Sequence, residues 1–264
     1  MKITLATIFY NNYTELKRLI ESIPKDTIDY FIGIDGIFKY TQEQHLELPE
    51  LSDDGSRQLF LTDGSDSKQY VSILVNCENK TEYEKRNRYL EICTNFDDID
   101  CIIIVDTDEL FFYEPGYTPE DSWNRFRKNL EFEMRRYPGH NVFGIRYLDE
   151  AGTDTYKPRV WVNPAKMRYV YGSHYNYANI ETEAKDIEYF KSQNLQYCQQ
   201  AQAIVKGVTL KHDHSLRSDE YQNRRKEYQK YLVKFESLVQ SHKYTQEEAH
   251  KIAKENPSSD FQPT

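Results

Sequence analysis

The sequence lacks long hydrophobic runs and has few cysteines. Its longest wholly apolar stretches, such as residues 101–105, are far shorter than the roughly 20 residues that a membrane-spanning helix needs, so we expect no transmembrane segment. Residues 1–9 run directly into polar residues without the cleavage site of a secretory leader. The four cysteines show no CxxC spacing, which argues against a zinc site or disulfide scaffold and favours a cytoplasmic protein. They are Cys77, Cys93, Cys101 and Cys198.

Positive charge is also scarce. Lys and Arg number 34 against 43 Asp and Glu, which gives a formal net charge of -9. Proteins that hold nucleic acid neutralise its phosphates with clustered Lys and Arg, so nucleic acid is not an expected partner. Residues 7–13 contain no glycine, and the missing glycine-rich phosphate loop argues against a nucleotidyltransferase.

The sequence does contain the alternation of strand and helix patterns that is typical of an α/β domain. Within 264 residues we expect one main domain with appendages. Strands are predicted over residues 2–9, 30–34, 71–75, 101–105, 141–147, 159–162 and 203–210. Helices are predicted over residues 12–23, 81–93, 121–137 and 218–238, with a last short helix from Thr245. Residues 39–68, rich in acids, Ser, Gly and Gln, are expected to form an irregular insertion.

Acidic residues follow the fourth predicted strand directly, in the order Asp106-Thr107-Asp108-Glu109. Ligands of open α/β sheets bind just outside the carboxyl ends of the strands. Side chains two residues apart on an extended chain point the same way, so Asp106 and Asp108 can both approach one hard cation. Mg²⁺ or Mn²⁺ held there would keep phosphate oxygens among its ligands. The alternative is that both acids face water. Glu109 is expected to form an ion pair, and its alternative roles are a further metal ligand or a hydrogen-bond acceptor that orients one.

A histidine pair follows the last predicted strand, as His212-Asp213-His214. Imidazoles two residues apart can share a face, so one of these histidines is a candidate for a further metal ligand. The alternative interpretation is that hydrogen bonds within the protein satisfy both rings.

Two further segments carry groups that grip polyhydroxylated or phosphorylated ligands. Arg forks, aromatic faces and small turn residues occur in Lys157-Pro158-Arg159-Val160-Trp161 and in Tyr171-Gly172-Ser173-His174. Acceptor binding is one interpretation. The other is that Trp161 belongs to the core and that Arg159 pairs with one of the surplus acids.

Taken in order, four segments resemble the nucleotide-sugar half of family 2-like glycosyltransferases, which have the GT-A fold and a DxD motif. They are Thr7-Ile8-Phe9-Tyr10-Asn11, Ile34-Asp35-Gly36, Lys85-Arg86-Asn87 and Ile104-Val105-Asp106-Thr107-Asp108-Glu109, within about the first half of the chain. Arg159, Gly172-Ser173-His174 and Lys211-His212-Asp213-His214 resemble acceptor-side and metal-side motifs more weakly.

The resemblance implies an α/β fold of GT-A type, a Rossmann-like, nucleotide-sugar-binding mixed sheet flanked by helices, with a C-terminal helical extension. It implies a glycosyltransferase domain over residues 1–215 and an extension over 216–264. Within that domain, residues 1–113 would form the nucleotide-sugar half and residues 114–215 the acceptor half.

The resemblance also assigns roles to single residues. Thr7, Phe9 and Asn11 would line the nucleoside pocket, and Asp35 would reach the base or ribose of a UDP- or GDP-sugar donor. Lys85 and Arg86 would face the donor phosphates or pair with Asp106. A divalent cation, Mn²⁺ or Mg²⁺, would be held by Asp106, Asp108, His212 and His214.

The catalytic base is the least defined part of the prediction. No Glu-Asp pair stands after the fifth predicted strand, where inverting members of the family carry one, and Asp149, Glu150 and His174 are the candidates. A retaining transfer leaves the proton to the leaving phosphate, so the stereochemistry stays open. We expect a metal-dependent glycosyltransferase that moves a sugar to a carbohydrate or other hydroxyl acceptor. The alternatives are a non-catalytic carbohydrate- or nucleotide-binding protein of the same fold and a nucleotidyltransferase.

Overall fold

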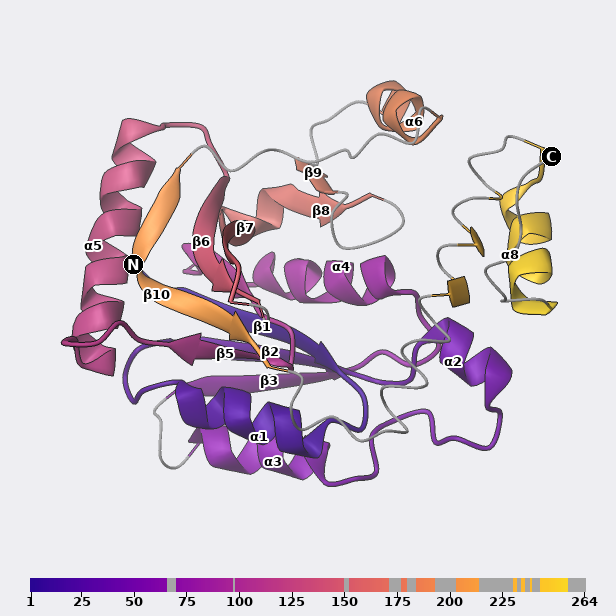
Figure 1. Cartoon of the computed structure of the whole chain (residues 1–264), viewed down its shortest axis with the longest axis horizontal. Coiled ribbons are helices and arrows are strands. Elements are labelled where there is room, and N and C mark those ends of the chain that lie inside the picture. The colour runs from indigo at the N-terminus through magenta and orange to yellow at the C-terminus, as the bar shows by residue number, and fades with distance from the viewer. Residues whose placement is uncertain are drawn as a thin grey trace. The chain divides into compact units, whose positions relative to one another are not determined.

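Figure 1 shows the chain as a computed structural model that divides into two compact units. The first comprises Met1–Thr182 and Tyr197–Leu216, and the second comprises Glu183–Gln196 and Arg217–Thr264. The structure describes residues 1–65, 70–96, 98–149, 152–170, 177–179, 184–192, 203–213, 230–231, 234–235, 238 and 243–255.

The first unit is built on an eight-stranded mixed sheet. In spatial order its strands are β3 (Val71–Asn76), β2 (Tyr30–Asp35), β1 (Ile3–Phe9), β4 (Cys101–Ile104), β7 (Asp154–Val162), β6 (Val142–Leu148), β10 (Ile204–His212) and β5 (Glu109–Phe112). Strands β7 and β5 run antiparallel to their neighbours, and all other pairs are parallel. The carboxyl ends of β1, β2, β3, β4, β6 and β10 therefore lie at one edge of the sheet.

Helices cover both faces of this sheet (Figure 1). Helices α1 (Tyr13–Ser22), α3 (Ser56–Ser65) and α5 (Pro119–Arg136) share one apolar core with one face, and α4 (Glu82–Cys93) shares a second core with the other. A short helix α2 (Lys39–Gln44) follows β2. Beside α4, a 3-10 turn at Pro164–Lys166 leads into a small antiparallel pair, β8 (Met167–Tyr169) and β9 (Tyr177–Asn179).

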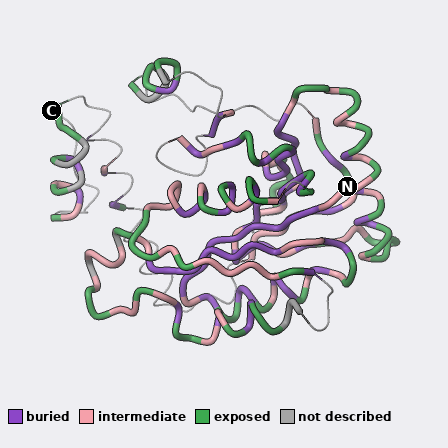
Figure 2. Tube along the Cα trace, turned by 180° about the vertical axis from the view of Figure 1, so that it is seen from behind, coloured by how far each residue is buried: buried purple, intermediate pink, exposed green. Residues whose placement is uncertain are grey.

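The central strands are apolar on both sides because both faces are covered. Every residue of β1 and β4 is buried, as the purple strands of Figure 2 show. The alternation of a strand divides β1 between the cores: Leu5 and Phe9 face α1 and α3, whereas Ala6 and Ile8 face α4. The wholly apolar runs in the sequence are thus the signature of this three-layer packing.

Two local features fix the ends and the spacing of these elements. Thr81 and Glu84 form the predicted capping box at the start of α4. Gly207, with φ of 129°, lies where β10 crosses α5, and a Cβ atom there would stand 2.5 Å from the backbone nitrogen of Phe126. Only glycine permits that approach, and the register of β10 against β6 shifts between Val205 and Thr209.

The second unit contributes α6 (Ala184–Ser192) and α8 (Gln246–Glu255) to the described residues. Thr245 and Glu248 cap α8 as the sequence predicts, with the Glu248 carboxylate accepting from the Thr245 amide at 2.8 Å. Of the helix predicted over 218–238, the structure describes only residues 230–231, 234–235 and 238, all of them helical. In the part of the chain that is described, no helix has the length and apolar character needed to span a bilayer.

The predicted mixed sheet flanked by helices is confirmed. The prediction of an irregular insertion over residues 39–68 is wrong, because this region contains α2 and α3, with Leu59 and Phe60 of α3 buried. Strand β7 begins at Asp154 rather than residue 159, and β5 was not predicted. The domain boundaries and the cellular compartment stay predictions.

Candidate active site

The strand order places a ligand-binding position next to the predicted acids. The chain moves from β1 outward to β2 and β3, then returns to place β4 on the other side of β1. Such a reversal leaves a crevice outside the carboxyl ends of the strands, which is where ligands bind in open α/β sheets. Residues directly after β1, β2 and β4, including Asn11, Gly36 and Asp106, therefore meet at one edge.

Asp106 lies between two arginines that come from different elements. Its Oδ1 accepts from Nη2 of Arg86 in α4, and its Oδ2 accepts from Nη2 of Arg159 in β7, both at 2.8 Å. The same Arg159 nitrogen donates to Oε1 of buried Glu109 at 2.6 Å, so Glu109 forms the expected ion pair. Glu109 also accepts from the Asp106 amide at 2.9 Å, which closes the acidic loop on itself.

Both arginines are charged although they are buried. Burial disfavours the charge on Arg159, but the carboxylates of Asp106 and Glu109 outweigh that effect and raise its pKa. Arg86 is 3% exposed and also pairs with Glu82 through Nε at 2.9 Å. Within the described chain, its Nη1 is buried without a hydrogen-bond partner. This nitrogen is therefore an unsatisfied donor inside the protein.

Asp108 meets His212, because β5 begins directly after Asp108 and pairs with β10. Its Oδ2 lies 2.6 Å from Nε2 of His212 at the end of β10. The adjoining backbone is joined as well, since the Asp213 amide donates to the Asp108 carbonyl at 2.8 Å. Asp213 in turn accepts from Nη2 of Arg18 in α1 at 2.5 Å. The other predicted metal ligand, His214, lies outside the described residues.

The donor set of this pair fits a divalent cation. The Asp108 carboxylate oxygen is the kind of ligand that Mg²⁺ and Mn²⁺ prefer, and the His212 imidazole nitrogen is a common ligand of transition metals. In this structure the two atoms are bonded directly to each other at 2.6 Å. Among the residues whose placement is described, no group of three or more His, Cys, Asp or Glu side chains gathers. Asp106 is the weaker of the two predicted acid ligands, because both of its oxygens already accept from arginines.

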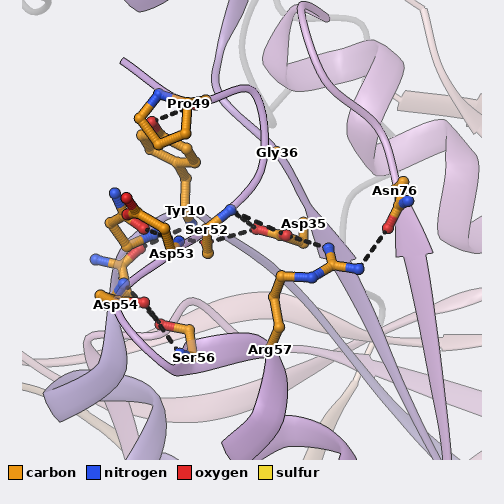
Figure 3. A network of polar contacts seen from close by, with 12 residues as sticks. Tyr10, Asp35, Gly36, Pro49, Ser52, Asp53, Asp54, Ser56, Arg57 and Asn76 are labelled. Carbon is orange, nitrogen blue, oxygen red and sulfur yellow. Dashed lines mark hydrogen bonds and ion pairs between the residues drawn. The ribbon is translucent and has the colours of Figure 1, made fainter.

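Asp35 forms a second polar centre at the end of β2 (Figure 3). The carboxylate is fully buried; Oδ1 accepts from Ser52 Oγ at 2.6 Å and Oδ2 from Arg57 Nη1 at 2.5 Å. Nη2 of Arg57 then donates to Oδ1 of Asn76 at the end of β3, at 2.9 Å. Sequence reasoning missed Ser52, Arg57 and Asn76, because their segments were assigned to an insertion or to an ordinary strand end.

The end of β1 is fastened to the segment that carries Ser52. The Tyr10 hydroxyl donates to the Pro49 carbonyl at 2.6 Å, and the Asn11 amide donates to Ser52 Oγ at 2.8 Å. Asn11 Oδ1 accepts from the Asp53 amide at 2.9 Å, and Asn11 has a left-handed φ of 49°. Asparagine is one of the few residues that adopt this conformation readily. The predicted nucleoside residue Asn11 thus lies beside the Asp35 centre.

The remaining residues predicted for the nucleoside end lie deeper. Phe9 is 1% exposed, and its ring centroid is 5.6 Å from that of Phe60 in α3. Thr7 is also buried in β1, and its hydroxyl has no hydrogen-bond partner in the described residues. Both belong to the packed strand here, and their contact with a nucleoside stays a prediction.

Lys85 and Arg86, predicted to share one role, point to different places. Arg86 pairs with Asp106 as one alternative of the prediction states. Lys85 is fully buried and donates through Nζ to the carbonyl oxygen of Gly36, directly after Asp35. A contact of Lys85 with donor phosphates stays a prediction.

Of the three candidate bases, the structure describes only Asp149. It follows β6, whose last residue Leu148 pairs with Lys211 of β10 beside His212. Its Oδ1 accepts from the Thr153 amide at 2.7 Å and so closes the turn between β6 and β7. Glu150 and His174 lie outside the described residues, as do Tyr171, Gly172 and Ser173.

The acceptor-side segment before β8 is structural in its described part. Trp161 is 1% exposed, with its ring centroid 5.0 Å from that of Tyr169 and 4.6 Å from that of Tyr177. Its Nε1 donates to the Pro158 carbonyl at 3.0 Å. Together with the ion pairs of Arg159, this agrees with the alternative in which Trp161 is core and Arg159 pairs with acids.

No protein-family model and no curated protein matches the chain. Among solved structures, S. aureus TarS 1-349 in complex with UDP-GlcNAc is 14% identical with a TM-score of 0.39, over 59% of this chain and 37% of that one. TarS 1-349 without that ligand is 10% identical with a TM-score of 0.47, over 97% and 71% of the two chains.

Glucosyl-3-phosphoglycerate synthase from Mycobacterium tuberculosis, in complex with Mn²⁺, UDP and glucosyl-3-phosphoglycerate, is 12% identical with a TM-score of 0.46. That alignment covers 90% of this chain and 79% of the synthase. The chain spans 37% and 23% of the length of the first two TarS structures that it matches. At these identities and TM-scores, the likenesses do not identify the reaction of this chain.

Proposed function

We propose that the chain is a metal-dependent glycosyltransferase of the GT-A type, which moves a sugar from a nucleoside diphosphate donor to a hydroxyl acceptor. The observation that carries the proposal is the meeting of Asp108 and His212 at 2.6 Å beside the Asp106 cluster. A carboxylate oxygen can bind a divalent cation, and guanidinium N–H groups can donate to phosphate oxygens. The topological reversal at β1 and β4 supplies the crevice.

The residues of the site would divide the donor between them. Asn11 and the Asp35 centre would bind the nucleoside, and Asp108 and His212 would hold Mn²⁺ or Mg²⁺ at the diphosphate. A bound cation at that position would neutralise charge on the leaving group. Arg86 would donate from Nη1 to a phosphate oxygen while Asp106 fixes its orientation.

The acceptor proton would go to Asp149, Glu150 or His174 in an inverting transfer. Asp149 is at the correct edge of the sheet, since β6 and β10 end side by side there. Its Oδ1 accepts one amide hydrogen from Thr153, which orients the carboxylate. A UDP- or GDP-sugar is the proposed donor, and a carbohydrate or another hydroxyl compound is the proposed acceptor.

The test is calorimetric titration of UDP and GDP with and without Mn²⁺, on the full chain. Wild type should bind either UDP or GDP, and only in the presence of Mn²⁺. Asp108→Ala should lose that binding. Asp98→Ala is the matched control, because Asp98 pairs with Lys2 before the start of β4, at the opposite edge of the sheet. The proposal would be refuted if wild type bound neither nucleotide, or if it bound one equally well without Mn²⁺.

A second assay separates the enzyme from its main rival. Sugar nucleotides of the base that binds would be incubated with Mn²⁺ and a panel of carbohydrate acceptors, and release of the nucleoside diphosphate would be followed. Metal-dependent nucleotide binding without turnover on any acceptor would favour a non-catalytic binding protein of the same fold.

A further inference from the structure

Three consecutive residues of α4 each reach a different segment of the site. Lys85 donates to the Gly36 carbonyl, and Arg86 donates to Asp106 at 2.8 Å. Asn87 bridges the backbone of Tyr169 in β8, donating to its carbonyl at 2.8 Å and accepting from its amide at 2.7 Å. Helix α4 therefore ties the turn after β2, the acidic loop after β4 and strand β8 to one rigid element.

Lys85 is the least expected of these contacts, because a lysine is rarely fully buried. Its relative exposure is 0%, and its Nζ lies 4.5 Å from the centroid of the Phe38 ring. The hydrogen bond to Gly36 and the cation–π contact with Phe38 join the amino group to the segment after β2. The side chain is thus enclosed between α4 and the turn that begins at Gly36.

That turn has little freedom of its own. Gly36 has a φ of 144°, and a Cβ atom there would stand 2.7 Å from the backbone nitrogen of Glu78. The Cys77 amide donates to the Asp35 carbonyl at 2.7 Å, and the Ile37 amide donates to the Glu50 carbonyl at 2.8 Å. The backbone of Asp35 and Gly36 is therefore held from β3, from the segment before Ser52 and, through Lys85, from α4.

We propose that Lys85 is a positioning residue that fixes the Asp35 turn, and with it the nucleoside end of the donor site, without contacting the diphosphate. The inference rests on the proposed function for the identity of the ligand. It differs from the expectation that Lys85 faces the phosphates, because the amino group is enclosed and directed at a backbone carbonyl.

The charge of Lys85 gives this role a pH dependence. Burial lowers the pKa of Lys85 to about 8, and the neighbouring Cys77, Asp35 and Glu78 oppose that shift. Below this pH the hydrogen bond to Gly36 is charge-assisted, and above it the donor is a neutral amine, whose hydrogen bond is roughly half as strong. Nucleotide affinity should therefore weaken as the pH rises through about 8.

The experiment compares wild type with Lys85→Met, which keeps an unbranched side chain one atom shorter and removes the donor. Arg88→Met is the matched control, because Arg88 is a half-exposed cation of the same helix paired with Glu91. Binding of UDP or GDP and of inorganic pyrophosphate would be titrated in Mg²⁺ at several pH values between 6.5 and 9.5, values chosen about 1.5 units either side of that pKa.

At pH 7, Lys85→Met should weaken nucleotide binding by roughly tenfold and leave pyrophosphate binding unchanged. The nucleotide Kd of Lys85→Met divided by that of wild type should then fall by about threefold to fivefold above pH 8, because only wild type has the Lys85 amino group that loses its proton there. An equal loss of nucleotide and pyrophosphate would overturn the proposal in favour of phosphate contact. The proposal would also be overturned if Lys85→Met bound nucleotide as tightly as Arg88→Met.

A measurement on the free protein keeps the inference independent of the ligand. Hydrogen exchange of the Ile37 amide should be roughly tenfold faster in Lys85→Met than in Arg88→Met. If wild type binds no nucleotide, the proposed function fails, and this exchange rate still decides whether Lys85 fixes the turn. Equal exchange in both variants would refute the positioning role.

Discussion

The carboxylates of the two polar centres, Asp35 in one and Asp106 with Asp108 in the other, take their hydrogen-bond partners from differently placed parts of the chain. Asp35 is saturated by Ser52 and Arg57, which follow it within one continuous stretch of chain. Asp106 and Asp108 draw their partners from α4, β7 and β10, more than 100 residues apart in the extreme case of His212. The Asp35 centre, the proposed nucleoside end, is thus a local structure, whereas the Asp106–Asp108 centre, the proposed diphosphate end, forms only when α4, β7 and β10 are assembled around β4.

This difference has a consequence for stability. Loss of a partner from the assembled centre leaves charges inside the protein, because Arg159 and Glu109 are 11% and 1% exposed. If Asp35 is removed from its centre, water can solvate the Arg57 charge that is left, since the Arg57 side chain is 30% exposed. Substitutions at the two centres should therefore differ in what they do to folding and to binding.

The largest effect is expected for Arg159→Met. The change leaves Glu109 buried without its cation and removes one of the two arginines on Asp106. We expect the free energy of unfolding to fall by about 3–5 kcal/mol, as when one partner of a buried ion pair is removed. Urea unfolding followed by circular dichroism measures it.

The control for that substitution is Arg125→Met. Arg125 pairs with Glu114 at 3.4 Å, and the two side chains are 37% and 43% exposed. An exposed pair of this kind contributes less than about 1 kcal/mol. Equal losses in the two variants would show that Arg159 does not hold a buried charge cluster.

A second contrast between the centres is their response to pH. Folding lowers the pKa of Lys85 beside the Asp35 turn from 10.5 to about 8. Between these values the unfolded chain binds more protons at this residue than the folded chain, so the stability of wild type should rise with pH. Relative to Lys85→Met, wild type should gain at most about 3 kcal/mol of unfolding free energy from pH 8 to pH 10.

Chemical denaturation of both proteins at each pH measures the difference, and the subtraction removes the titration of the groups they share. The two arginines at the diphosphate end keep their charge throughout this range. A constant difference between the proteins would show that Lys85 keeps its ordinary pKa in the folded state.

The sequence predicts those site residues that stand at or just after the end of a recognisable strand. Asp106 and Asp108 follow the apolar run of β4, which is buried throughout, and His212 is the last residue of β10. Arg86 was placed near Asp106 only through the resemblance. Of the Asp35 centre, the sequence points to Asp35 but not to its partners Ser52 and Arg57, because their polar segment was assigned to an irregular insertion although α3 begins at Ser56.

The partners of Asp35 were missed because only their burial distinguishes them from exposed loop residues, and burial is not visible in the sequence pattern. Ser52 and Ser56 are polar residues that hydrogen bonds bury at 7% and 0% exposure. Their composition is the same as that of an exposed loop. Likewise, Lys85 and Arg86 occupy adjacent positions on one helix, and only the structure shows that Lys85 bonds to Gly36 whereas Arg86 bonds to Asp106.

The smallest predicted effect tests whether the diphosphate end needs support from outside its own strands. Arg18 of α1 pairs with Asp213, whose amide is bonded to the Asp108 carbonyl. Helix α1 is itself anchored to β5, since Ser22 Oγ accepts from the Phe111 amide at 3.1 Å. Arg18 thus braces the segment that carries His212 against Asp108.

Arg18→Met should weaken Mn²⁺ affinity by about tenfold in the presence of the nucleotide, which is the effect of removing a residue that orients a metal ligand. Lys17→Met is the control, because Lys17 pairs with Glu21 on the exposed side of α1. The measurement is a Mn²⁺ titration at saturating nucleotide, with thermal unfolding recorded alongside. If Arg18→Met lowered the unfolding temperature but left Mn²⁺ affinity equal to that of Lys17→Met, the ion pair would serve the fold alone. The diphosphate end would then be organised by β4, β7 and β10 without help from α1.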